Sequence, residues 1–337
     1  MALKFNDIGE FGFIESIRKE LKTPSDKIIK GIGDDCAVLG PYSGRVLLFT
    51  TDMLVEDIHF LKDKITPYQL GWKSAAVNLS DIAAMGGLPV AILVSLGIPS
   101  ETDVRLIQDL YKGMKDICEH YAVNIAGGDT TASPDKLIIS VSAIGDAEES
   151  EILYRYGARP GDKIYLTGNV GDSYAGLKIL KQEISIPDSI GSHFIKAHNQ
   201  PIPLVETGMT IAASRLAGSM IDLSDGLLSD LGHICKESGV GAVIFGDKLP
   251  ISAELKYLCS QTNLDPLDLS LSGGEDYILL VTVPKANSKD FELILKDKGS
   301  SPLYPIGEIS KDKGIRMVND DGSIKELEPK GFDHFSP

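Results

Sequence analysis

The stretch WKSAAVNLSDIAAMGG, which runs from Trp72 to Gly87, has the pattern of a helix built from small residues. Apolar residues recur at steps of four, three and four, at Trp72, Ala76, Leu79 and Ala83. This spacing places them on one face of a helix, which we expect to run from about residue 68 to 85 and to end at the glycine pair. Asp81 then lies in the last turns, where the helix dipole disfavours a carboxylate that neither water nor a cation compensates.

Strands and helices alternate on both sides of this segment. The apolar run 46–50 predicts a buried strand that delivers Thr51 and Asp52 at its end. Gly127-Gly128-Asp129 has the composition of a turn. The other elements expected in this half are helices at 14–21 and 104–121 and strands at 90–98 and 137–144.

The second half of the chain repeats this alternation. An acidic stretch at 148–151 and a turn-rich segment at 157–162 precede it, so we place a domain boundary after residue 148. The two domains, 1–148 and 149–337, each mix helices and strands, which indicates an α/β (α+β) fold. Helices are expected at 173–181, 203–216 and 225–237, and strands at 163–167 and near Met220, Gly241, Tyr277 and Pro305.

Composition limits the classes of function. A chain of 337 residues, 43% of them hydrophobic, can form two domains with separate cores. The net charge of −15 argues against a nucleic-acid or anionic-membrane surface, and an anionic substrate would have to be admitted by metal ions and local donors. The sequence has no signal-peptide pattern, long apolar run or paired-cysteine motif, so we expect a cytoplasmic protein with reduced thiols.

Acidic residues on short turns that carry Gly or Ser are the main functional signal. They are Asp34-Asp35, Asp52 after Thr51, Asp81, Asp129 after Gly128, Asp222 and Asp225 on either side of Ser224, and Glu275-Asp276. Carboxylates gathered around one cleft repel one another unless cations share the site, and hard divalent cations take oxygen ligands. The set therefore predicts Mg²⁺ together with a phosphorylated ligand. Any single acid could instead be a turn former or a helix cap, as Asp225 could be for the helix that follows it.

Several common signatures are absent from the sequence. It contains no Gly-Lys dipeptide, hence no P-loop, and no catalytic-loop signature of protein kinases. It has no Gly-x-Ser-x-Gly elbow, and among its histidines only His193 and His198 approach a zinc-ligand spacing. A bound ATP would be held in some other way.

Six runs of sequence, taken in order, resemble the thiamine-monophosphate kinase family. They are GIGDD from Gly31, TTD from Thr50 with HF at His59, AVNLSDIAAMG from Ala76, GGDTT from Gly127, IDLSDG from Ile221 and SGGEDY from Ser272. The likeness covers essentially the whole chain and ends with GFDHF at 331–335. A broader resemblance is to aminoimidazole-ribonucleotide synthetase and selenophosphate synthetase, which share the fold and the acidic metal cluster.

The resemblance implies ATP-dependent phosphorylation of thiamine monophosphate to thiamine diphosphate, with several Mg²⁺ ions in each active site. The implied metal ligands are Asp35, Thr51, Asp52, Asp81, Asp129, Asp222 and Asp225, and the six acids among them would be catalytic through the metal. The implied ATP contacts are Thr50, Tyr111, Gly128, Asp129, Arg155 and Ser224. The implied contacts to thiamine monophosphate are His59, Glu275 and Phe332. Direct ligation by Asp34 and the effect of Asp57 stay open.

The resemblance further implies a homodimer with an aminoimidazole-ribonucleotide synthetase-like fold. The N-terminal domain would pair with its copy in a β-barrel that spans the dimer, and the C-terminal α/β domain would complete the active-site cleft. A Mg²⁺-dependent phosphohydrolase, another ATP-dependent enzyme of the same superfamily, or a non-catalytic metal or nucleotide sensor would use similar acids and stay as alternatives.

Overall fold

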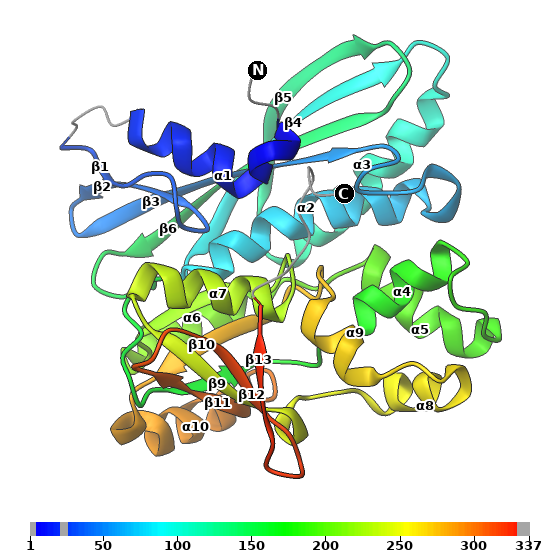
Figure 1. The fold of residues 1–337 in the computed structure, drawn as a ribbon. Helices are drawn as coiled ribbons and strands as arrows, with labels where there is room; N and C mark the ends of the chain where they lie inside the picture. The colour runs from blue at the N-terminus through cyan, green and yellow to red at the C-terminus, as the bar shows by residue number, and fades with distance from the viewer. Residues whose placement is uncertain (1–4, 21–25, 329–337) are drawn as a thin grey trace.

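The computed structural model describes residues 5–20 and 26–328, which form two β-sheets covered by helices (Figure 1). The first sheet has six strands in the order β1-β2-β3-β6-β4-β5. These are β1 (Ile28–Lys30), β2 (Ala37–Tyr42), β3 (Arg45–Val55), β4 (Leu88–Pro99), β5 (Asn124–Ser133) and β6 (Ile138–Glu148). Only β4 and β5 pair in parallel, because the helix α3 (Val104–His120) forms the crossover between them.

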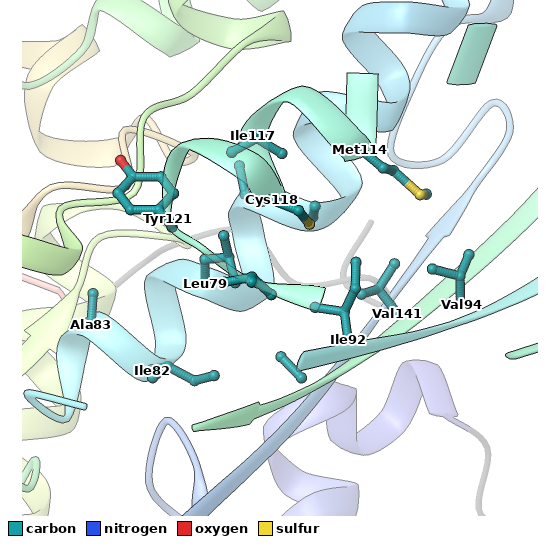
Figure 2. Close-up of a cluster of buried hydrophobic side chains, with 14 of the residues drawn as sticks. Leu79, Ile82, Ala83, Ile92, Val94, Met114, Ile117, Cys118, Tyr121 and Val141 are labelled. Atoms are coloured by element: carbon teal, nitrogen blue, oxygen red, sulfur yellow. The ribbon is translucent and has the colours of Figure 1, made fainter. Parts of the chain in front are cut away.

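The helix α2 (Pro67–Ala84) lies with α3 against one face of this sheet. Thr66 begins α2 with a capping box formed with Gln69. Figure 2 shows the core that the two helices share with the sheet, which includes Leu79, Ile82 and Ala83 of α2, Met114, Ile117 and Cys118 of α3, Tyr121, Ile92 and Val94 of β4, and Val141 of β6. The helix predicted at 68–85 is thus confirmed, and its small residues let it pack closely.

The second sheet has seven strands in the order β13-β12-β9-β11-β7-β10-β8. They are β7 (Lys163–Leu166), β8 (Ser219–Asp222), β9 (Gly241–Phe245), β10 (Leu279–Val283), β11 (Tyr304–Ser310), β12 (Gly314–Val318) and β13 (Ile324–Leu327). Both faces of the sheet are covered, so the residues of β10 are buried throughout.

Helices cover the second sheet on both sides. α7 (Leu227–Ser238) packs against one face, while α6 (Val205–Ser214) and α10 (Ser288–Asp297) pack against the other. A separate group of helices shares its own small core, namely α4 (Asp172–Leu180), α5 (Asp188–Asn199), α8 (Ala253–Thr262) and α9 (Pro266–Ser272). The sequence analysis missed α5, α8, α9 and α10.

α2 also joins the two halves of the chain. It contacts α6 and β8, which belong to the second half. The approach of α6 is close, because a Cβ added to Gly208 would lie 2.1 Å from the carbonyl oxygen of Ala83. The C-terminal end of α2, which carries Asp81, therefore lies at the boundary between the halves.

Two local predictions are wrong. Thr51 and Asp52 lie in the middle of β3, which continues to Val55, and not at the end of a strand. Gly128 and Asp129 lie inside β5 and do not form a turn. A Cβ on Gly128 would lie 1.7 Å from the carbonyl oxygen of Val94, so glycine is needed there by the packing of β5 on β4.

Asp225 is also not the cap of the helix that follows it. The N-cap residue of α7 is Gly226, and no side chain makes a capping hydrogen bond there. All four cysteines lie in the described part of the chain, buried and without a disulfide, as expected. Within the same part, no helix combines the length and apolar character required to cross a bilayer.

Candidate active site

A cleft of about 960 Å³ is lined by residues from both halves of the chain. Most of the site residues named from the sequence lie in its wall: Asp35, Thr50, Thr51, Asp52, His59, Asp81, Arg155, Ser224, Asp225 and Glu275. The first helix, α1 (Phe5–Glu20), adds Glu10, Phe13 and Ile14. Residues far apart in the sequence thus share one cavity.

Three clustered acids form the centre of the site: Asp35 and the half-buried Asp81 line the cleft, and the buried Asp222 adjoins them. Asp35, Asp81 and Asp222 each bring a carboxylate oxygen to within 4.8 Å of the other two. Burial raises the pKa of Asp35 and of Asp222 to about 6, and burial together with the neighbouring acids raises the pKa of Asp81 well above its usual value. Oδ2 of Asp35 is buried without a hydrogen-bond partner among the described residues. Crowded carboxylates with a free oxygen fit a hard divalent cation such as Mg²⁺.

β3 adds polar groups to this centre because alternate residues of a strand point to the same face. Thr50 donates a hydrogen bond from Oγ1 to Oδ2 of Asp81, at 2.5 Å. The backbone N–H of Asp52 donates to Oδ1 of Asn78 on α2, at 3.1 Å, and burial raises the pKa of the Asp52 carboxyl to about 6. Thr51 borders the cleft, but its hydroxyl is directed to the other face of the sheet, where it donates to the carbonyl of Val141 at 3.2 Å, so its role as a metal ligand stays a prediction.

Arg155 lies beside the acid centre and compensates part of its charge. Its Nε and Nη2 donate to Oδ1 of Asp35 at 3.1 and 2.5 Å. Asp34 is engaged elsewhere, because Lys30 lies 3.1 Å from its Oδ2 and the backbone N–H of Arg155 donates to its Oδ1. The geometry gives Asp34 the role of holding the loop that presents Asp35.

A second acidic group adjoins the cleft at the start of α7. Asp225, Asp230 and His233 place ligand atoms within 4.8 Å of one another. Asp230 accepts hydrogen bonds from the backbone N–H groups of Asp225 and Gly226, at 3.2 and 3.1 Å. Asp230 therefore fixes this turn, while Asp225 faces the cleft.

Glu275 and two basic side chains form a further part of the wall. Nζ of Lys73 lies 2.8 Å from Oε1 of Glu275, and Nδ1 of His198 lies 3.1 Å from its Oε2. Burial opposes ionisation of Glu275, but the charge of Lys73 and its hydrogen bond to the carboxylate outweigh burial and lower the pKa of the carboxyl. His59 accepts a hydrogen bond on Nδ1 from the backbone N–H of Val55, at 3.0 Å, which fixes the orientation of its ring.

The chain matches known families over both halves. Residues 33–147 match the AIR synthase related protein, N-terminal domain, and residues 159–319 match the AIR synthase related protein, C-terminal domain. Thiamine-monophosphate kinase from Aquifex aeolicus (strain VF5) is 37% identical over 333 residues, which cover 99% of this chain and 100% of the relative. The chain belongs to the thiamine-monophosphate kinase family.

Other members of the family agree with this assignment. Thiamine-monophosphate kinase from Escherichia coli (strain K12) is 39% identical over 97% of this chain and 98% of its own length. A solved structure of AaThiL complexed with AMPPCP and TMP superposes with a TM-score of 0.87 at 36% identity, with 99% of each chain covered. The crystal structure of thiamine monophosphate kinase from Aquifex aeolicus gives a TM-score of 0.79 at 35% identity, covering 94% of this chain and 98% of the other.

Some residues assigned by family resemblance lie away from the cleft. In the sheet, Asp52 pairs with Val141, which pairs with Val94, which pairs with Gly128. Gly128 is therefore three strand spacings, roughly 14 Å, from Asp52.

Asp129 follows Gly128 and pairs with Ser95, so its side chain shares the outer face of the sheet with Thr51. Tyr111 of α3 packs against the core of the N-terminal half. Phe332 lies outside the described residues. The roles of Gly128, Asp129, Tyr111 and Phe332 stay predictions.

The sequence analysis missed Lys73 and His198. Lys73, Val77 and Asp81 are spaced by four residues, so they share one face of α2, and all three line the cleft. That spacing could have identified Lys73 from the sequence. The spacing of His198 from His193 drew attention to it only as a zinc ligand, and its contact with Glu275 arises only through the tertiary fold.

Proposed function

We propose that the chain transfers the γ-phosphoryl group of ATP directly to thiamine monophosphate, giving thiamine diphosphate. The observation that carries this proposal is the cluster of Asp222 with Asp35 and Asp81, two acids that line the same cleft as Glu275 and His59. Family membership supports the reaction, since relatives that match nearly the whole chain are thiamine-monophosphate kinases.

Phosphoryl transfer requires positioning and charge compensation more than covalent help from the protein. Bound Mg²⁺ would neutralise charge on the phosphates. Its proposed ligands are Asp35, Thr51, Asp52, Asp81, Asp129, Asp222 and Asp225. Arg155 supplies a permanent positive charge beside these acids, and Ser224 and Thr50 complete the ATP side of the cleft.

The acceptor explains why no general base is assigned. The second pKa of a phosphate monoester is about 6, so its oxygen is largely ionised near neutral pH. An in-line attack by this oxygen then requires that the acceptor be oriented, and no proton has to be removed from the acceptor. His59 and Glu275 are proposed to orient the acceptor, together with Phe332.

We also propose that the chain works as a homodimer through the outer face of the first sheet. Phe49, Met53 and Leu93 are exposed on this face, at 36%, 54% and 43%. A dimer-spanning barrel would cover them. Within one chain the sheet keeps Asp129 away from Asp52. The dimer would instead bring Asp129 of one copy to the active site of the other. In this arrangement residues 1–148 form the dimerising domain and 149–337 the domain that completes the cleft.

The direct test is to incubate the protein with ATP, Mg²⁺ and thiamine monophosphate and to separate the thiamine species. Thiamine diphosphate formed in proportion to ADP supports the kinase. Release of inorganic phosphate without thiamine diphosphate would identify a phosphohydrolase instead. Binding of ATP and Mg²⁺ without any turnover would identify a sensor.

A further inference from the structure

Lys73 is a buried cation that connects the two halves of the chain. It lies on α2 in the first half, and its exposed fraction is 0%. Its partners, Glu275 and His198, both belong to the second half. Nζ lies 2.8 Å from Oε1 of Glu275 and 3.4 Å from Nε2 of His198, while Nδ1 of His198 lies 3.1 Å from Oε2 of Glu275. The three side chains form a closed ring of polar contacts.

The proton positions in this ring follow from the chemistry of the groups. Burial, and then the charge of Lys73, lower the pKa of His198 to about 4, so the imidazole is neutral. An ammonium group only donates, so Nε2 of His198 accepts from Lys73 and Nδ1 carries the proton. Nδ1 can then donate to Glu275 or to Oγ of Ser173, which lies 3.2 Å away. Both oxygens of Glu275 therefore face a donor.

The backbone of Glu275 is also constrained. Its φ is 65°, in the left-handed region that residues other than glycine rarely adopt. Its N–H donates to the carbonyl oxygen of Ser224 at 2.7 Å. A strained backbone persists where the surroundings determine it, and such positions are frequent at ligand sites. The Glu275 carboxylate is thus held from both its main chain and its side chain.

We propose that Lys73 is a positioning residue that, with His198, fixes the Glu275 carboxylate in the wall of the cleft for the acceptor. The inference rests on the proposed function, in which Glu275 contacts thiamine monophosphate. A fixed carboxylate suits the cationic ring and the amino group of a thiamine moiety. Because Lys73 reaches Glu275 across the boundary between the halves, it aligns an acceptor group of the second half with the acid centre beside Asp81.

The competing explanation is that Lys73 only holds the two halves together. The two roles differ in what removal of the cation changes. If Lys73 were purely structural, its removal would lower stability and raise the KM of both substrates together. If Lys73 positions Glu275, its removal raises the KM of the acceptor alone, and only in protein that still has Glu275.

The experiment is a double-mutant cycle with Lys73→Met and Glu275→Gln, measured in the full-length protein. We expect Lys73→Met to raise KM for thiamine monophosphate about tenfold or more, because it leaves the half-buried Glu275 carboxylate without its main donor. The KM for ATP should stay within about twofold. In the Glu275→Gln background the same change should have almost no further effect on the acceptor KM, because the group it positions is gone.

A fallback comparison and one further variant serve as controls. If Lys73→Met is insoluble, the double variant removes both charges at once and can be compared with Glu275→Gln alone. Lys62→Met is the matched control, because Lys62 is 45% exposed, lies in the nearby 3₁₀ helix η1 (Lys62–Lys64) and pairs only distantly with Glu56, at 3.8 Å. It should leave both KM values unchanged.

The outcomes separate this inference from the proposed function. Full additivity of the two substitutions, or equal rises in both KM values, would assign Lys73 a purely structural role and overturn the inference. If wild-type protein forms no thiamine diphosphate, the proposed function fails, whatever the variants do.

Discussion

Asp222→Asn should stabilise the metal-free protein. Asp222 is 1% exposed and shares its surroundings with Asp35 and Asp81. Burial is the main reason that its pKa rises from 3.8 to about 6. Above that pH the folded protein holds a buried negative charge that the unfolded chain exposes to water. An amide removes this charge, while its oxygen can still accept the hydrogen bond that Ser80 donates at 2.5 Å.

The size of the effect follows from the difference between the pKa of Asp222 in the folded and the unfolded protein. Moving the pKa from 3.8 to about 6 corresponds to about 3 kcal/mol of stability lost when the group ionises. The new amide N–H groups also need partners, so we expect a net gain of about 1–3 kcal/mol. The raised pKa of the folded state fixes the sign. The penalty is absent below about pH 4, grows as pH rises from about 4 to 6 and is complete above 6, so the gain should be seen only at higher pH.

The assay is thermal unfolding with EDTA and with Mg²⁺, at pH 7.5 and again near pH 4.5. In EDTA at pH 7.5 the variant should melt about 3–6 °C above wild type, and near pH 4.5 most of this difference should disappear. Added Mg²⁺ should raise the melting temperature of wild type, since a ligand that binds only the folded state stabilises it. The melting temperature of the variant should rise less on addition of Mg²⁺.

Asp247→Asn is the control, because Asp247 is 45% exposed, pairs with Lys248 and is not among the residues that line the cleft. It should leave both melting temperatures unchanged. A lower melting temperature of Asp222→Asn in EDTA at pH 7.5 would refute the reasoning. So would a Mg²⁺ response equal to that of wild type.

Three further predictions concern turnover and assembly. Asp52→Asn should lower kcat by about a hundredfold or more without unfolding the protein, because a proposed metal ligand is lost without opening a cavity; a near-normal rate at saturating Mg²⁺ would remove Asp52 from the site. Leu93→Arg should convert a dimer to a monomer in sedimentation experiments and lower turnover, because it places a charge on the exposed face of β4; a wild-type monomer at micromolar concentration would contradict the dimer. His59→Asn should raise the acceptor KM about tenfold and largely preserve the single-turnover rate, and the wild-type rate should fall below about pH 6 as the acceptor phosphate takes a proton; efficient phosphorylation of unphosphorylated thiamine would show that a protein base exists.

The helix α2 is the element that the sequence determined best. Its periodicity, its small residues and the glycines after it are local properties, and local properties are visible in the chain. The same holds for the acids as a set, since six motif runs identify them without any structure. Their burial and their mutual distances were not visible.

Strand boundaries depended on pairing and not on local sequence. Thr51 and Asp52 continue β3 because β6 pairs with them, and Gly128 extends β5 because only glycine fits against Val94 of β4. A strand has no internal hydrogen bonds, so its length is decided by its neighbour.

The sequence alone determined the family, the mixed α/β class and the type of chemistry, because these depend on which residues are present and in what order. Tertiary structure alone decided which side chains meet. It brought Lys73 of α2 to Glu275, which lies about two hundred residues later, and it turned Asp129 away from the cleft that holds Asp52. Such contacts arise from how helices and sheets pack, and a packing partner leaves no signal in the local sequence of either residue.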